Sequence, residues 1–253
     1  MGRDKKMRSF SLTGLFLFSI LLSLALPAGT VSASNETTSG TITGTETWAG
    51  VHTLTGDVTI APGAKLIINP GATIEFPNGT HLDVRGSLCA GVASCGASSN
   101  AGPAMRINLR WSEPVNASAT GECYGMSYGN QEIWIDDPSC SEGVLMRSSI
   151  DLAETGLRYV NFDSAWGIPQ YISAVGEFRY GALVLDGASP TLTELSFNQI
   201  NTSSVLTTNL AQPSFNGGDF AVGIDANTGI VGAALQIYSC LLYTSPSPRD
   251  EQS

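Results

Sequence analysis

The side chains in this sequence that could do chemistry are few, and the densest group of them is a set of carboxylates. Asp136 and Asp137 are adjacent, with Glu132 before them and Glu142 after them. Clustered carboxylates can bind calcium, and a pair can serve as the acid and the base of a glycosidase. A solvated loop explains the same residues without any ligand. We expect the loop, keep Asp136, Asp137 and Glu142 as candidate calcium ligands, and assign no catalytic residue and no other cofactor.

Histidines and aromatic residues are the other side chains that could have a functional role. His52 and His81 are the only histidines, and neither has an acidic or nucleophilic residue at a motif spacing, so surface or turn positions are expected. Aromatic residues gather in two segments, 112–143 and 164–180. Their large rings could stack on sugars or could pack the segments onto the rest of the chain. As candidate glycan-binding residues we take Tyr124, Trp134, Trp166 and Tyr171.

The elements that would position these groups are short strands. Apolar segments with alternating character begin every eight residues, at 58–60, 66–68, 74–76 and 82–84. The turns between them place Gly63, Gly71 and Gly79 eight apart as well; a proline directly precedes the first two, and Pro77 lies two residues before Gly79. Pro presets φ and Gly accepts a positive φ, so each unit is one strand and one tight turn. Three units make a circuit of 24 residues, which predicts that 82–84 pairs in parallel with 58–60.

A meander of antiparallel hairpins would have the same spacing. Two-residue hairpins prefer Asn-Gly or Asp-Gly, whereas two of the three connections contain Pro-Gly, which suits a type II corner. The turn residues therefore favour a solenoid. Further strands are predicted at 105–111, 144–150, 157–162, 182–185 and 192–197. No stretch has a sustained period of 3.6 residues, so little helix is expected beyond the N-terminal segment.

Several short motifs also carry a family resemblance. They are Gly56-Asp57-Val58, Pro70-Gly71-Ala72 and Leu82-x-Val84-x-Gly86, preceded by Trp48-x-Gly50. Residues 48–90 resemble the opening coils of secreted right-handed parallel β-helix proteins, a superfamily with pectate-lyase-like enzymes and many non-enzymatic surface proteins. The resemblance implies an all-β, right-handed parallel β-helix with loop insertions over residues 48–239.

The resemblance does not extend to a catalytic motif. The polygalacturonase branch has Asn-Thr-Asp, Gly-His-Gly and Arg-Ile-Lys motifs, and none of them occurs here. The lyase branch uses carboxylates that hold calcium and an arginine that acts as the base. Acids and arginines are present, but no motif selects among them, and pairing on an outer face is the expected role. These residues are Arg106, Arg110, Arg147 and Arg158, with Asp83, Glu113, Asp151 and Asp163.

Both ends of the chain differ from the repeated pattern. Residues 1–33 have a basic start, an apolar run and the small-x-small triplet Val31-Ser32-Ala33, which is typical of a signal peptide. An uncleaved anchor is the alternative. Residues 34–47 are predicted to be a flexible lead-in. From Cys240 onward the chain resembles a translated sequencing adaptor, so we expect 240–253 to be a non-native tail and the β-helix to be truncated near Ser239.

Export has consequences for cysteine and asparagine. The even number of cysteines before the tail predicts two disulfides, with neighbours in sequence paired. The predicted pairs are Cys89 with Cys95 and Cys123 with Cys140. A metal site is the alternative, but no Cys-x-x-Cys pair is present. Sequons that could accept glycans are Asn35, Asn78, Asn116 and Asn201.

The charge of the chain narrows the function. Residues 34–239 contain 7 basic and 19 acidic residues, a net charge of −12, which disfavours nucleic acid and anionic membrane as partners. Membrane contact is expected only through the signal segment or a C-terminal anchor beyond this sequence. We expect a secreted or cell-surface scaffold that binds polysaccharide or other surface material through its insertions. The alternative is a β-helix polysaccharide lyase or glycoside hydrolase, with or without calcium.

Overall fold

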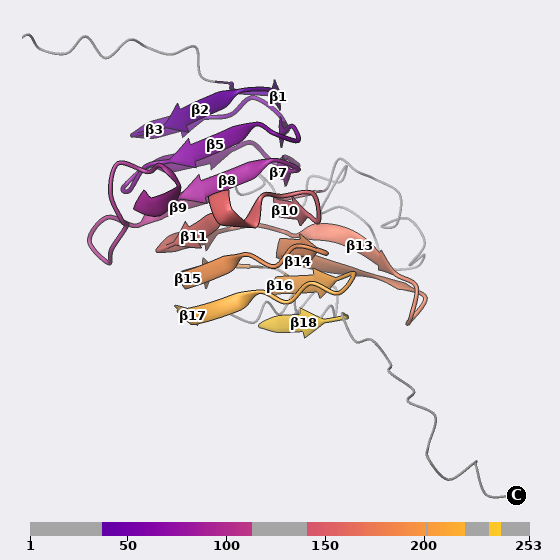
Figure 1. The fold of residues 1–253 in the computed structure, drawn as a ribbon. Helices are drawn as coiled ribbons and strands as arrows, with labels where there is room; N and C mark the ends of the chain where they lie inside the picture. Colours follow the sequence, from indigo (N-terminus) through magenta and orange to yellow (C-terminus); the bar gives the residue numbers. More distant parts are fainter. Residues whose placement is uncertain (1–36, 113–140, 201, 221–232, 239–253) are drawn as a thin grey trace, which may run out of the picture. The chain divides into compact units, whose positions relative to one another are not determined.

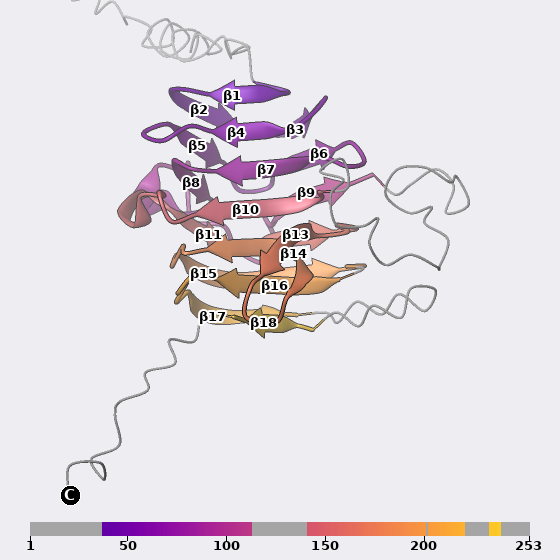
Figure 2. The same ribbon diagram turned by 90° about the vertical axis from the view of Figure 1, so that its right-hand side faces the viewer.

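The computed structural model describes residues 37–112, 141–200, 202–220 and 233–238, and these residues are all-β. The predicted signal peptide, the tail from Cys240 and residues 113–140 lie outside the described part. The strands of the described part form two sheets. Figures 1 and 2 show the strands arranged in successive layers from β1 at one end to β18 at the other. None of the helices in the described part has the length and apolar character needed to cross a membrane.

The first sheet takes every third strand of the early chain. Its order is β1 (Gly40–Ile42), β4 (Val58–Ile60), β7 (His81–Val84), β10 (Gly143–Arg147), β14 (Glu177–Asp186), β16 (Ser203–Thr208) and β18 (Leu235–Ile237). All of these neighbours pair in parallel. One further strand, β13 (Ile168–Ile172), pairs antiparallel with β14.

The second sheet holds the strands in between. Its order is β2 (Thr45–Trp48), β5 (Lys65–Ile68), β8 (Ser87–Ala90), β11 (Gly156–Arg158), β15 (Thr191–Asn198), β12 (Val160–Asp163), β9 (Ile107–Trp111), β6 (Thr73–Phe76) and β3 (Val51–Thr53), with β17 (Ser214–Asp219) beside β15. All of its pairings are parallel. The long strand β15 joins two series of strands, because Thr191–Thr193 pair with β11 and Ser196–Asn198 pair with β12.

The predicted pairing of the apolar segments is confirmed. Val58 lies opposite Leu82 and Ile60 opposite Val84 in parallel strands, and all four side chains are fully buried. The arrangement is compatible with the parallel β-helix expected from the sequence. Buried residues of both sheets belong to one core cluster, so the sheets share a single hydrophobic interior.

Part of that interior is a row of aromatic rings on neighbouring strands. Phe76 stacks on Trp111 at a centroid distance of 4.4 Å, and Phe162 stacks on Phe197 at 4.7 Å. Trp111 and Phe162 are nearly parallel at 6.3 Å, which connects the two pairs. Phe76 lies in register with Trp111, and Phe162 lies in register with Phe197. Phe162 lies opposite Leu109, two residues before Trp111, which fits the longer distance in the middle of the row.

The turns between the early strands have the backbone conformation that their Pro and Gly residues indicated. Gly63, Gly71 and Gly79 have φ values of +79°, +80° and +75°, the left-handed region in which Gly avoids the penalty of a side chain. Gly86 is required for a different reason. A Cβ atom there would lie 2.3 Å from the carbonyl oxygens of Ala61 and Ala64, so the chain can pass this corner only without a side chain.

The beginning of the fold differs from the expectation. Within the predicted flexible lead-in 34–47, strand β1 pairs with β4, and β2 pairs with β5. The sequence there is rich in Thr and Gly, but alternate residues such as Ile42 still reach the core. Short strands with few apolar residues are stabilised by pairing with the next strands, which a composition argument does not detect.

The position of His52 also differs from the prediction. Its side chain is buried rather than on the surface, and its ring stacks on that of Trp48 at 4.3 Å. The Nε1–H group of Trp48 donates to Glu46, which also accepts a hydrogen bond from the hydroxyl of Thr37 at 2.8 Å. Trp48 itself is fully buried in strand β2 and belongs to the shared core cluster.

Candidate functional site

The carboxylate group that could hold calcium is only partly described. Asp136 and Asp137 lie outside the described residues, and Glu142 is fully buried. Its Oε1 accepts from the backbone N–H of Gly79 at 2.8 Å and its Oε2 from that of Trp166 at 2.9 Å. Within the described ranges, no three His, Cys, Asp or Glu residues are grouped as metal ligands would be. The carboxylate of Glu142 therefore connects two turns, and its role as a calcium ligand stays a prediction because Asp136 and Asp137 lie outside the described residues.

One of the two predicted disulfides is confirmed. Cys89 in β8 is bonded to Cys95 in the short 3-10 helix Ala93–Cys95. The bond lies in a small apolar cluster with Ala97, Ile67 and Val92. It fastens the first part of the insertion after β8 to the outer side of the sheet. Cys123 and Cys140 lie outside the described residues.

Of the four arginines noted in the sequence, Arg110 and Arg147 pair with acids, as expected. Arg106 instead donates to the side chain of Asn161, and Arg158 donates to the carbonyl of Ala101. Asp83 is almost fully buried, and its carboxylate contacts Arg85 at 2.8 Å and Arg147 at 3.1 Å. Arg147 also lies 3.4 Å from Asp186 on the next strand. This ladder of alternating charge crosses β7, β10 and β14. Because each charge already has a partner, the ladder stabilises the register and presents no unpaired base.

His81 has an acidic neighbour that its local sequence did not reveal. Oδ1 of Asp57 lies 3.1 Å from Nδ1 of His81 and accepts a hydrogen bond from the backbone N–H of the same residue at 2.9 Å. Among the described residues, none forms a hydrogen bond with Nδ1, although Asp57 lies close to it. The pairing was missed because the two residues lie 24 positions apart and meet only when the strands are stacked.

The candidate glycan-binding aromatics separate into different environments. Tyr124 and Trp134 lie outside the described residues. Trp166 is buried, with 4% of its surface exposed, so its ring does not offer a face to solvent. Tyr171 is 59% exposed on β13. Of the four candidates, Tyr171 alone is shown to be accessible in the described part.

Tyr171 belongs to an aromatic face on the β13–β14 hairpin, which Figure 2 shows at the front of the sheet. Tyr171 lies opposite Phe178, with ring centroids 5.2 Å apart and planes tilted by 57°. Pro169 lies opposite Tyr180, two residues along each strand, so all four side chains share one face. Burial raises the pKa of the Tyr180 hydroxyl above 10.0.

The other face of this hairpin explains why it is held in place. Ile168 is buried against Leu145, Val184 and Leu206, which lie on the outer side of the first sheet. Apolar residues at these outward positions require a cover, and β13 supplies part of it. The sequence identified 164–180 as an aromatic insertion, but it did not predict an antiparallel hairpin with one anchored and one aromatic face.

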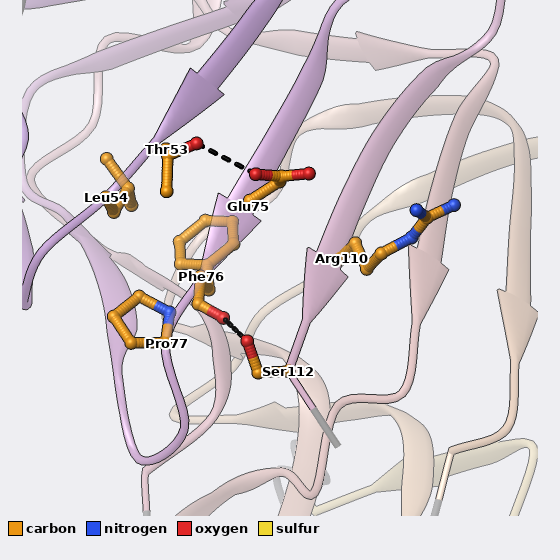
Figure 3. Close-up of a pocket in the computed structure, with 7 residues that line it drawn as sticks. All are labelled: Thr53, Leu54, Glu75, Phe76, Pro77, Arg110 and Ser112. Carbon is orange, nitrogen blue, oxygen red and sulfur yellow. Dashed lines mark hydrogen bonds between the residues drawn. The ribbon is translucent and has the colours of Figure 1, made fainter.

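A second feature is a hollow of about 280 Å³ beside the ends of β3, β6 and β9 (Figure 3). It is lined by Thr53, Leu54, Glu75, Phe76, Pro77, Arg110 and Ser112. Glu75 and Arg110 supply its charged groups, and Leu54, Phe76 and Pro77 supply its apolar part. Arg110 was among the arginines noted in the sequence, whereas Glu75 was not singled out because nothing near it in sequence suggested a site.

Comparisons with models of protein families, with curated proteins and with solved structures found no match to this chain.

Proposed function

We propose that the described strands are coils of a right-handed parallel β-helix in an exported protein, and that this helix is a non-enzymatic scaffold for glycan binding. Parallel pairing of strands three apart over the first ten strands supports the β-helix. The turn chemistry at Gly63, Gly71 and Gly79 and the resemblance of residues 48–90 to such proteins support it further. Export rests on the signal-like segment 1–33.

The observation that carries the binding function is the aromatic face of the β13–β14 hairpin. Exposed tyrosine rings have an apolar face and a hydroxyl, a combination suited to the C–H faces and hydroxyls of a sugar. The hairpin is anchored through Ile168, so Tyr171 and Phe178 are held on a rigid support and lose little freedom on binding. Rigid presentation of a few rings suits weak contacts that become strong when a polymer offers many copies.

The charged residues of the described part favour binding over catalysis. In the described part, the acids and arginines of the outer ladder are paired with one another, and Glu142 is buried in hydrogen bonds to backbone. A lyase or hydrolase needs a base or an acid within reach of the substrate in an accessible groove. The proposed role of the described residues is therefore adhesion or recognition, without bond cleavage.

Binding to a glycan array tests the proposal, with residues 34–239 and the single variants Tyr171→Ala and Val51→Ala. Val51 is 70% exposed on β3, away from the aromatic face, so its variant controls for the loss of an exposed apolar side chain. We expect Tyr171→Ala to weaken binding roughly tenfold, equivalent to about 1.4 kcal/mol, and Val51→Ala to leave it unchanged. Equal effects of both variants would contradict the role of the aromatic face.

A degradation assay separates binding from catalysis. Residues 34–239 would be incubated with pectin, alginate and neutral polysaccharides, with and without calcium, and the release of new chain ends would be measured. We expect no turnover. Turnover that is lost in an Arg147→Ala or Asp136→Ala variant would overturn the proposal in favour of the enzymatic alternative.

A further inference from the structure

Glu75 and Arg110 carry opposite charges and are neighbours, but each interacts with a different residue. They lie directly opposite each other on the parallel strands β6 and β9. Opposite charges in such positions attract and would be expected to pair. Instead, Glu75 accepts a hydrogen bond from the hydroxyl of Thr53 at 2.8 Å, and Nε of Arg110 lies 3.5 Å from Asp163. Figure 3 shows Glu75 directed toward Thr53 and the Arg110 guanidinium on the side away from Glu75.

The hollow described above lies beside these two separated charges. Pro77 contributes an apolar surface, and the Ser112 hydroxyl donates to the carbonyl of Phe76 at 3.2 Å. Its volume of about 280 Å³ is slightly below the range of ordinary ligand pockets, which begins at about 300 Å³. This space suits one ring of a sugar better than a longer ligand segment.

The charges also indicate which sugars fit. Two carboxylates, Glu75 and Asp163, surround the single guanidinium of Arg110. An anionic sugar would meet a guanidinium that Asp163 already neutralises, together with a second carboxylate that repels it. A neutral sugar meets no such repulsion. Its hydroxyls can donate to the carboxylate of Glu75 and accept from the remaining N–H groups of Arg110, whose side chain is 57% exposed.

We propose that this hollow is a binding subsite for one neutral sugar residue. Glu75 and Arg110 bind its hydroxyls from two sides, and the ring rests on Pro77. The inference rests on the proposed glycan-binding function and deepens it, because it names the class of sugar and a second place of contact. The separation of Glu75 from Arg110 is the arrangement that such a ligand requires, since an ion pair between them would fill the same space.

Calorimetric titration of residues 34–239 tests the subsite, with cellohexaose and mannohexaose as neutral probes and hexagalacturonate as the acidic probe. The variants are Glu75→Gln, Arg110→Met and, as a control, Asp151→Asn, which changes an exposed acid on a different loop. We expect a neutral probe to bind, Glu75→Gln and Arg110→Met each to weaken it at least fivefold, and Asp151→Asn to have no effect. Circular dichroism of each variant shows whether the fold is retained.

Several outcomes would overturn the inference and are distinguishable from failure of the proposed function. Loss of neutral binding in Tyr171→Ala, with none in Glu75→Gln or Arg110→Met, would remove the subsite and leave the glycan-binding scaffold standing. Tighter binding of hexagalacturonate that depends on Arg110 would show that the hollow selects acids instead. Failure of all probes here and of the glycan array would remove both proposals together.

Discussion

Replacement of Phe162 by Ala tests the aromatic row directly. The Phe162 ring is fully buried, parallel to Phe197 at 4.7 Å and to Trp111 at 6.3 Å. Removing a buried Phe side chain costs about 3–5 kcal/mol, through lost transfer energy and the cavity that remains. Neighbouring strands hold the backbone in register on both sides, so the site can collapse little and the upper part of this range is expected.

Urea unfolding followed by circular dichroism measures this loss. With a urea dependence of about 2 kcal/mol/M, a loss of 4 kcal/mol lowers the midpoint by about 2 M. Phe178→Ala is the matched control, because Phe178 is only partly buried on the outer face of the hairpin, and its midpoint should fall by less than about 0.5 M. Similar midpoints for the two variants would refute the assignment of Phe162 to a packed interior row.

Two further predictions concern the disulfide and the tyrosine of the hairpin. Replacing both Cys89 and Cys95 by Ala should lower the free energy of unfolding by about 2 kcal/mol, the value for a short closed loop, and a melting temperature equal to that of the parent protein would contradict it. Burial raises the pKa of Tyr180 in the folded protein above the ordinary value of 10.0. As the pH rises above 10.0, the unfolded protein therefore loses the phenolic proton before the folded protein does. The free energy of unfolding falls over this pH range, until the pKa of the folded protein is passed. Tyr180→Phe should reduce this alkaline loss in melts at successive pH values, and an unchanged loss would show that Tyr180 is not its source.

The sequence predicted those features that depend on neighbours in the chain. The eight-residue spacing of Gly63, Gly71 and Gly79 indicated where the turns lie. The same spacing predicted that 58–60 pairs with 82–84. The bond between Cys89 and Cys95 was predicted from proximity in sequence. Local chemistry is sufficient in these cases because the turn or the loop is itself the structural constraint.

Features that depend on the next strand could not be predicted in the same way. His52 was expected on the surface, but it is buried because Trp48, in the preceding strand, stacks on it. Asp83 and Arg147 are 64 residues apart and form an ion pair because β7 and β10 are neighbours. A motif search that examines short spacings cannot find the pair of Asp83 and Arg147, since the insertion between their strands sets the separation.

The number of residues between paired strands varies along the first sheet, and this bears on where the proposed binding sites lie. Leu82 follows its partner Val58 by 24 residues, Val144 follows Leu82 by 62, and Leu183 follows Val144 by 39, yet each pair keeps the same parallel register. Extra residues therefore leave the sheet without disturbing the core beneath them. The aromatic face of Tyr171 lies in one such excursion, and Ser112 at the hollow is the last described residue before another. If binding resides in outward-facing side chains and stability in the buried rows, Tyr171→Ala and Glu75→Gln should change affinity while their urea midpoints stay within about 0.5 M of the parent protein, in contrast to Phe162→Ala.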